Sequence, residues 1–210
     1  MFRAVGAPRR KPGRPPRADV ERLVLAEAAR RFATDGYERV TVEDLIQGAG
    51  VSRATFYKHF DGREDVLAAL YQSEAEALRA HVLATLDEEG TFAEITRKSV
   101  VVYFRALAAR GPLYRELTRL SYANERLLAL REDVTAGYVK AMRASLKRRL
   151  GVEVPEFLID ATLTAVDRVA QKALARGAVS PARLEGVVDK GAEAIRTFMM
   201  AAIAANMAGR

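Results

Sequence analysis

The sequence predicts an all-α protein of about nine helices, and three observations support this fold class. Apolar residues recur at helical spacing, as at Leu25, Ala28 and Phe32, after which Gly36 ends the first helix. Helix starts are marked by a cap residue with an acidic residue three positions later. Helix ends are marked by glycine or proline. No stretch shows the alternation and turn punctuation of β-strands.

Two further short helices are expected between residues 40 and 60. Thr41 followed by Asp44 resembles a capping box, and it begins a helix that Gly48-Ala49-Gly50 breaks. Ser52 caps the next helix, which is expected to run through Phe60. A short helix, a glycine-containing turn and a second short helix together predict a helix-turn-helix.

Six more helices are expected after this motif. Asp61 and Glu64 repeat the pattern of cap and acid, and they open a helix that continues toward Gly90. The same signals give the remaining expected segments: Thr91 to Gly111-Pro112, Leu113 to about Tyr122, Leu127 to Leu150, Pro155 to Arg176, and from Ser180-Pro181 onward.

The composition excludes several classes of protein. Because the chain has no cysteine, disulfides, thiolate metal sites and cysteine nucleophiles are ruled out. The two histidines, His59 and His81, are too few and too far apart for a histidine metal site. The longest apolar run, residues 198–205, is far shorter than the roughly 20 residues of a membrane span. With no P-loop or nucleophile elbow, we expect no enzyme, metal, cofactor or membrane partner.

The positive charge is concentrated in a tail, residues 1–17. The tail holds six of the 34 lysine and arginine side chains and no acidic one, and the net charge of the whole chain is +7. Four of the seven prolines also lie in the tail, so we expect it to be extended. A basic tail on a near-neutral body favours a polyanionic partner such as nucleic acid.

The third expected helix has the side chains of a DNA-reading helix. Phe56 and Phe60 lie four residues apart and anchor one face, while Arg53 and Tyr57 lie four apart on an adjoining face. The rest of the exposed arc holds Thr55, Lys58 and His59. Such a helix suits a major groove. The alternative is a small amphipathic helix with a solvated polar face, and the basic tail favours the DNA reading.

Four stretches share the residues of a known DNA-binding domain: Ala28-Ala29-Arg30-Arg31-Phe32, Gly36-Tyr37, Thr41-Val42-Glu43-Asp44-Leu45 and, most specifically, residues 49–60, Ala-Gly-Val-Ser-Arg-Ala-Thr-Phe-Tyr-Lys-His-Phe. On these stretches, residues 18–80 resemble the DNA-binding domain of the TetR family of bacterial transcription regulators, and the resemblance is a specific one. It continues through Arg63-Glu64 and is dense over about 60 residues. Asp61-Gly62 departs from the family pattern, where proline, lysine or serine is common.

The resemblance implies specific contacts with DNA. Arg53, Ala54 and Tyr57 would face bases or the adjacent backbone. Thr41, Thr55, Lys58 and His59 would contact phosphates or base edges. Arg63 would bind a phosphate at the start of the fourth helix. The alternatives are a capping role alone for Thr41 and a partly buried histidine at position 59.

The tail also contains Gly13-Arg14-Pro15, which is similar to the core of an AT-hook. In that motif an arginine follows the minor groove and a proline keeps the chain extended. The alternative for Arg14 and its neighbours is nonspecific attraction to DNA.

The last two expected helices carry apolar stripes with many small residues, which permit close helix approach. In the resembling family these two helices form a four-helix dimer interface, so the resemblance implies a homodimer. The alternative is core packing within one subunit. The expected interface residues are Leu158, Ala165, Val169, Leu184, Val188, Gly191, Ala194, Ile195, Phe198 and Ala202.

The family also places an effector pocket in the C-terminal helices. We expect an unknown small apolar or amphipathic effector there, although aromatic residues at helical spacing are often plain core. Asp160 and Asp167 are expected to be solvated or paired with Arg168 and Lys172. The candidate lining residues are Phe92, Tyr103, Phe104, Tyr114, Tyr122, Tyr138, Met142 and Thr162.

The sequence therefore predicts a cytoplasmic, homodimeric regulator that binds a double-stranded DNA operator and is released by an effector, most simply a repressor. Residues 1–17 would form the tail, 18–65 the helix-turn-helix domain, and 66–210 the effector-binding and dimerisation domain, with a connecting helix to about residue 80. The alternatives are an effector-independent DNA-organising protein and a helical interaction protein.

Overall fold

The computed structural model describes residues 17–151, 153–174 and 181–208. Every regular element in these ranges is helical, in agreement with the expected all-α class. No helix in them is long and apolar enough to cross a membrane. The elements are α1 (Arg17–Thr34), a 3-10 turn η1 (Tyr37–Arg39), α2 (Val42–Ala49), α3 (Arg53–Phe56), α4 (Arg63–Leu86), α5 (Phe92–Ala109), α6 (Gly111–Ser121), α7 (Glu125–Leu150), α8 (Glu156–Leu174) and α9 (Pro181–Ala208).

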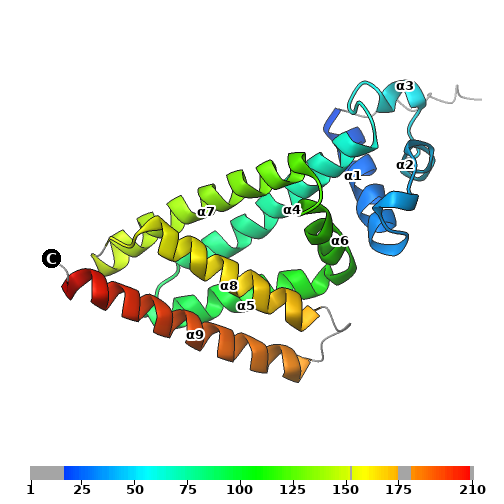
Figure 1. Ribbon diagram of the computed structural model, residues 1–210. Helices are drawn as coiled ribbons and strands as arrows, with labels where there is room; N and C mark the ends of the chain where they lie inside the picture. The colour runs from blue at the N-terminus through cyan, green and yellow to red at the C-terminus, as the bar shows by residue number, and fades with distance from the viewer. Residues whose placement is uncertain (1–16, 152, 175–180, 209–210) are drawn as a thin grey trace, which may run out of the picture.

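The helices form a small head joined to a longer helical body (Figure 1). The head consists of α1 to α3 and the first turns of α4. The long helices α4 and α7 run from the head to the far end of the molecule. Along the body, α8 lies beside α7, and α9 lies beside α5 and α8 (Figure 1). Helix α6 lies where the head meets the body, so it contacts both.

Local capping explains the boundaries in the head. Thr41 and Asp44 form the predicted capping box, in which the Thr41 hydroxyl accepts from the Asp44 amide and the Asp44 carboxylate accepts from the Thr41 amide. Gly50 ends α2 in the left-handed conformation, with φ of 65°, which glycine adopts without strain. The predicted second helix and its end are therefore confirmed.

Helix α3 is shorter than predicted. Ser52 caps it as expected, but the α-helix ends at Phe56 rather than at Phe60. The amides of Lys58 and His59 donate to carbonyls three residues back, so the chain winds more tightly after Phe56. This tighter turn brings Phe60 back into the core beside Phe56, with ring centroids 5.6 Å apart.

Two other predicted boundaries are wrong. Gly62, not Asp61, is the N-cap of α4, and the Asp61 amide donates to the Asp65 carboxylate over 3.3 Å. Gly111 and Pro112 do not only end α5; they form the first turn of α6, where proline fits because its missing N–H has no helical acceptor to lose.

The other predicted segments agree with the helices of the body. The predicted capping box at Thr91 starts α5, and Gly151 ends α7 with φ of 67°. The predicted ends of the last connection, Arg176 and Ser180, lie outside the described residues.

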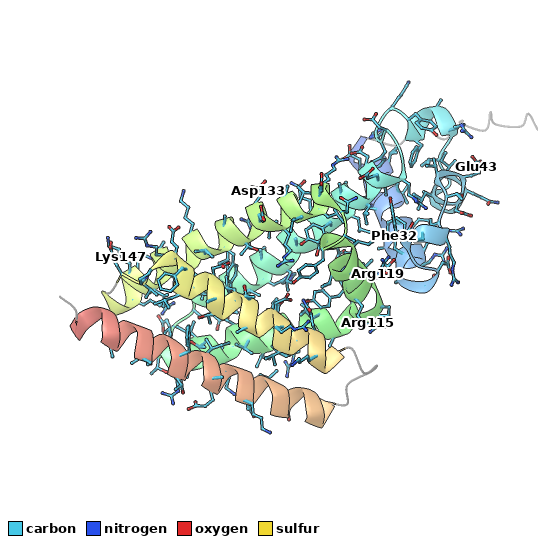
Figure 2. All side chains as sticks on the ribbon, viewed as in Figure 1. Phe32, Glu43, Arg115, Arg119, Asp133 and Lys147 are labelled. Atoms are coloured by element: carbon cyan, nitrogen blue, oxygen red, sulfur yellow. The ribbon has the colours of Figure 1, made fainter. Side chains whose placement is uncertain are left out.

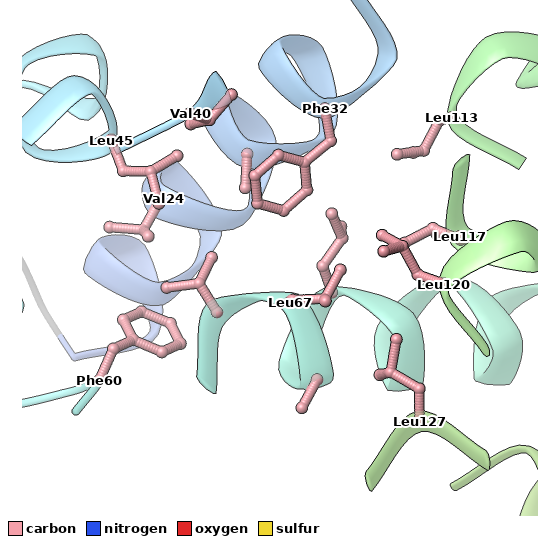
Figure 3. Close-up of a cluster of buried hydrophobic side chains, with 14 of the residues drawn as sticks. Val24, Phe32, Val40, Leu45, Phe60, Leu67, Leu113, Leu117, Leu120 and Leu127 are labelled. Carbon is pink, nitrogen blue, oxygen red and sulfur yellow. The ribbon is translucent and has the colours of Figure 1, made fainter. Parts of the chain in front are cut away.

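The core of the head is completed by the body. Phe32, Leu45 and Phe56 are fully buried in it, together with Leu67 from α4. Leucines from α6 and α7 pack into the same cluster, where Figure 3 shows Leu113, Leu117, Leu120 and Leu127 facing Phe32 and Leu67. Burial of each such side chain contributes about 1.5–3 kcal/mol, so α6 and α7 help to hold the head folded.

Two smaller clusters fill the body. One lies between α5, α8 and α9 and contains Phe104, Ala170 and Val188. The other lies between α7, α8 and the turn that joins them, and it contains Leu146, Val154 and Ile159. These clusters bury the inward side of α9 and of α8.

Candidate nucleic-acid interface

Helix α3 is held so that one of its faces is free for a partner. Phe56 and Phe60 are 0% and 5% exposed in the core of the head. The Ser52 hydroxyl accepts from the Thr55 amide over 3.1 Å and lies 2.8 Å from the Thr55 hydroxyl. Thr55 is therefore half-buried and already bonded at the helix start, which leaves it less available for DNA than its neighbours.

Four predicted DNA-binding residues lie exposed on and beside α3: Arg53, Ala54, Tyr57 and Lys58. We call these four the reading surface. The Tyr57 ring is 46% exposed and offers an aromatic surface beside the charged side chains. The Arg53 guanidinium lies 5.6 Å from the centre of that ring. The surface thus presents cationic, aromatic and small side chains together.

Thr41 lies exposed at the start of α2. Its hydroxyl donates to the Asp44 carboxylate over 2.6 Å, and the pKa of that carboxyl is lowered, mainly by this hydrogen bond. The capping role considered for Thr41 is therefore realised, and its exposure is compatible with a phosphate contact as well. Arg14, the remaining predicted DNA contact in the tail, lies outside the described residues.

His59 does not belong to the exposed surface. Its side chain is 7% exposed, and Nδ1 lies 3.3 Å from the Glu21 carboxylate on α1. The tight turn after Phe56 directs this ring toward α1. The alternative of a partly buried histidine is therefore realised at position 59, and a DNA contact of this side chain stays a prediction.

Arg63 is also committed to the fold. Its Nη1 donates to the backbone carbonyls of Tyr37, Glu38 and Val40 over 3.1, 3.2 and 2.8 Å. The guanidinium stacks on the Tyr37 ring at 4.2 Å from its centre. These contacts fasten the segment between α1 and α2 to the start of α4, so Nη1 of Arg63 already serves the fold, and the predicted phosphate contact of Arg63 stays a prediction.

We therefore expect Arg63→Ala to lower the free energy of unfolding by about 2 kcal/mol, because three carbonyls lose a charged donor. Urea denaturation measures this change. Arg39→Ala, which removes an exposed arginine from the same 3-10 turn, serves as the control and should change stability little. Unchanged stability of the Arg63 variant, combined with weaker DNA binding, would favour the phosphate role instead.

The sequence interpretation missed a charge network at the junction of α1 and α2. The Glu27 carboxylate accepts from Arg30 over 2.6 and 2.9 Å and from Arg31 over 2.6 Å. The hydrogen bond from Arg30, and then the one from Arg31, lowers the pKa of Glu27 to about 2. Glu27 packs directly against Gly48, where a Cβ atom would overlap its carboxyl group. The pairing of Gly48 with Glu27 had no signal in the sequence pattern.

The body contains a tyrosine–aspartate cluster among the predicted effector residues. Tyr103 donates to Asp167 Oδ1 over 2.8 Å, and Tyr114 donates to the same oxygen. Gln171 donates to Asp167 Oδ2 over 2.7 Å. Burial, with the Asp167 charge adding to it, raises the pKa of both tyrosines. Asp167 is thus held by neutral donors, and the expected pairing with Arg168 or Lys172 is wrong.

Of the other predicted effector residues, Phe104 packs against this cluster. It is fully buried, and its ring centroid lies 6.0 Å from that of Tyr103. Phe92 and Met142 pack instead beside the hydrophobic cluster that contains Ile159. The remaining three residues differ in their surroundings. The Thr162 hydroxyl donates to the Leu158 carbonyl over 2.7 Å, and burial raises the pKa of Tyr138. The Tyr122 side chain, by contrast, is 59% exposed. Tyr122 therefore does not line an interior site.

Arg131 was not predicted as part of this region. Its guanidinium lies 4.2 Å from the centre of the Tyr122 ring, and its Nη1 is buried without a hydrogen-bond acceptor. Burial raises the pKa of nearby Tyr71 to about 12, which the Arg131 charge opposes. A single arginine in a helix interior gives no sequence signal of burial.

Helix α6 carries contacts to both parts of the molecule. Tyr114 reaches Asp167 in the body, whereas Glu116 accepts from the Tyr37 amide in the head over 2.8 Å. Residues two apart point to nearly opposite sides of a helix. Figure 2 shows Arg119 of the same helix on the side next to the head, where it pairs with Glu116 over 3.0 Å.

The predicted dimer residues divide between two sides of α8 and α9. Ala165, Val169, Ala194 and Phe198 are exposed, with Val169 at 42% and Phe198 at 45%. Phe157 of α8, at 69% exposure, is also exposed and was not predicted. We call these five residues the outer face. A shallow depression follows α9 here and is lined by Asp189, Lys190, Glu193, Ala194, Thr197, Phe198 and Ala201.

The remaining predicted dimer residues face inward or are not described. Val188 is 3% exposed and packs with α5, Ile195 packs against two interior clusters, and a Cβ on Gly191 would meet Val100 at 3.8 Å. In this subunit α9 uses these three to cover α5 and the interior, and their predicted interface role stays a prediction. Leu158 is half-buried beside Ile159. The side chains of Leu184 and Ala202 lie outside the described residues.

Comparison with known proteins agrees with this arrangement. The family model for bacterial regulatory proteins of the tetR family matches residues 24–70, which span α1 to the start of α4. The transcriptional regulator EthR of Mycolicibacterium smegmatis is 43% identical over 61 residues, which is 29% of this chain and 28% of that relative. This match thus spans little more than a quarter of the relative's length.

Other similarities extend over the body. The nucleoid occlusion factor SlmA of Vibrio vulnificus is 29% identical over 157 residues, covering 72% of this chain and 78% of that protein. The solved structure of the fatty acid degradation regulator FadR from Bacillus halodurans superposes with a TM-score of 0.71 at 21% identity, over 87% of this chain and 95% of that one.

A tetR-family transcriptional regulator from Streptomyces coelicolor has a TM-score of 0.69 at 19% identity, over 89% of this chain and 83% of that one. The fold of the whole chain, the anchored helix-turn-helix and the matched family model agree with one another. The helix-turn-helix domain of this chain therefore belongs to the TetR family of bacterial transcription regulators, and the whole chain has the fold of solved structures of such regulators.

Proposed function

We propose that the chain binds a double-stranded DNA operator sequence-specifically as a homodimer and acts as a repressor that a small effector releases. The observation that carries the proposal is the reading surface, which stands exposed on a segment anchored by Phe56 and Phe60. Arginine recognises guanine edges in the major groove, and lysine binds phosphates. The chain would act in the cytoplasm, where bacterial DNA lies.

Each of the three predicted regions would bind a different partner. Residues 18–65 would bind DNA, and residues 66–210 would bind the effector and the second subunit. The tail, residues 1–17, would add attraction to phosphates that depends strongly on salt concentration. The charge of the tail supports this role, because it holds six basic side chains and no acid.

The outer face supports the homodimer. Phe157, Val169 and Phe198 expose large apolar side chains on two adjacent helices, beside small residues at Ala165 and Ala194. An apolar patch of this kind is characteristic of protein–protein interfaces, and two copies of two helices would form a four-helix contact. A dimer would place two reading surfaces on successive half-sites about 34 Å apart.

Helix α6 supports the coupling between effector and DNA. An effector that displaced Tyr114 from Asp167 would shift α6, and Glu116 would carry the shift to the Tyr37 amide. Arg63 links Tyr37 to the carbonyl of Val40, immediately before Thr41. An effector that binds the shifted state more tightly would then lower the population of the DNA-binding state.

The experiment is to capture genomic DNA fragments with the full-length protein and to sequence them. The proposal expects a small number of fragments that share a palindrome with half-sites about one DNA turn apart. Fragments without any shared sequence would contradict it.

A second candidate is an effector-independent factor that organises DNA. The similarity to SlmA favours it, since that match covers 72% of the chain and extends well beyond the head, whereas the EthR match covers 29%. The same capture experiment separates the two functions. Sites dispersed over the chromosome, outside promoters, would support the second candidate, and sites at a few promoters would support the repressor.

A further inference from the structure

Glu43 and Arg53 form an ion pair across the helix-turn-helix. Arg53 Nη1 donates to Glu43 Oε2 over 3.0 Å, and the two side chains are 68% and 67% exposed. Glu43 lies in the first turn of α2 and Arg53 is the first residue of α3. Figure 2 shows Glu43 at the end of the molecule formed by these two helices.

Stability of the fold does not account for this pair. Asp44, the neighbouring acid, forms the capping box and lies 3.4 Å from Arg31, so the start of α2 is held without Glu43. An exposed ion pair adds little to the stability of a protein. A carboxylate beside the reading surface also repels DNA phosphates, so it lowers electrostatic affinity. The contact that Glu43 makes is with Arg53, so Glu43 can act on the position of that guanidinium.

The geometry restricts Arg53 on two sides. Glu43 occupies Nη1, and the Tyr57 ring lies 5.6 Å from the guanidinium carbon. The guanidinium is a planar fork with five donors, so fixing one nitrogen leaves the others to meet the two acceptors of a guanine edge. An unrestrained arginine at the same place would reach phosphates on any sequence.

We propose that Glu43 is a positioning residue that determines specificity, holding Arg53 for base recognition and away from indiscriminate phosphate contacts. This inference rests on the proposed sequence-specific DNA binding. Removing the carboxylate charge should raise affinity for random DNA more than affinity for the operator. Discrimination between the two should then fall, although overall binding becomes tighter.

The test uses the full-length protein and the variant Glu43→Gln, titrated with operator and with random duplex at several salt concentrations. We expect the ratio of operator to random affinity to fall about fivefold, because an unrestrained arginine loses part of the discrimination of a base contact. The dependence of random-DNA affinity on salt should steepen by about one phosphate contact.

Two comparisons separate the action of Glu43 on Arg53 from the general effect of removing one negative charge. Glu38→Gln removes the same charge from an exposed site in the head, and it should leave the affinity ratio unchanged. In the Arg53→Ala background, Glu43→Gln should also leave the ratio unchanged, since the residue acts through Arg53. An equal change of the ratio in both backgrounds, or none in either, would overturn the inference.

The same data distinguish this inference from the proposed function. If the unmodified protein binds operator and random DNA equally, the proposed function fails. If the unmodified protein discriminates and Glu43→Gln discriminates equally well, only the role of Glu43 is wrong. Thermal unfolding checks that the head stays folded. The Glu43→Gln variant should unfold at the same temperature as the unmodified protein.

Discussion

Replacing Ala194 by arginine should convert the protein from a dimer to a monomer and lower its operator affinity roughly 100-fold or more. Ala194 is exposed on α9 beside Phe198, at the centre of the depression on the outer face. A second subunit seated there would bury the new guanidinium without a partner, which costs several kcal/mol. The monomer would hold only one half-site at a time. Sedimentation and operator titration on the same sample measure both effects.

A matched control separates the interface from the added charge. Ala129→Arg places the same side chain at an exposed alanine on α7 and should leave a dimer with normal operator affinity. Ala194 is exposed on its own subunit, so the substitution should leave the free energy of unfolding of each subunit unchanged. An Ala194 variant that remains dimeric would place the interface elsewhere. A monomer with full operator affinity would remove the need for two reading surfaces.

Acid should destabilise the head through Glu27. The pKa of this carboxyl is about 2 in the folded protein, against an ordinary value of 4.5. A lowered folded-state pKa contributes stability that is present above pH 4.5 and lost as the pH falls toward 2. Because Arg30 is exposed and solvent screens its charge, the full contribution is on the order of 1 kcal/mol. We therefore expect Glu27→Gln to lower stability at pH 7 by up to that amount, and the difference from the unmodified protein to vanish near pH 2.

Gly48→Ala should have the same effect, because its methyl group would occupy the place of the Glu27 carboxyl. Alanine normally stabilises a helix by about 0.5–1 kcal/mol relative to glycine. Gly186→Ala, at an open helical site on α9, is the control and should show this gain. Denaturation curves between pH 2 and 7 decide the matter. A stabilising Gly48→Ala would show that Glu27 moves aside at no cost.

Much of the fold followed from local signals in the sequence. Thr41, Thr91 and Gly151 act at the helix ends where the pattern placed them, because capping depends on neighbouring residues alone. Asp61 failed as a cap because Gly62 takes that position. Patterns of this kind do not show which of two adjacent candidates is used.

The site residues divide in the same way. Exposure of Arg53 and Tyr57 followed from their spacing against Phe56 and Phe60. His59 and Arg63 lie within the same motif, yet their partners are Glu21 and the carbonyls near residue 40, which only the packed head brings close. The family resemblance predicted which residue types occur in the motif, but it did not predict the contacts that His59 and Arg63 make.

The body was less predictable from sequence. An apolar stripe on α9 does not say whether a residue covers α5 or a second subunit, so Val188 and Phe198 received the same interpretation. Likewise, Asp167 had charged neighbours along its own helix, but the tyrosines of α5 and α6 hold it instead. Both outcomes depend on long-range packing.

If the reading surface recognises a DNA sequence, Arg53 and Tyr57 should contribute to the preference for the operator over random DNA. The most direct measurement is titration of the full-length protein, Arg53→Ala and Tyr57→Phe with operator and random duplexes at one fixed salt concentration. We expect the unmodified protein to prefer the operator by about 1000-fold or more. Arg53→Ala should lose about 1–3 kcal/mol of that preference, Tyr57→Phe should lose a smaller part, and both variants should stay folded. Equal affinity for operator and random DNA, or operator preference unchanged in both variants, would contradict the account.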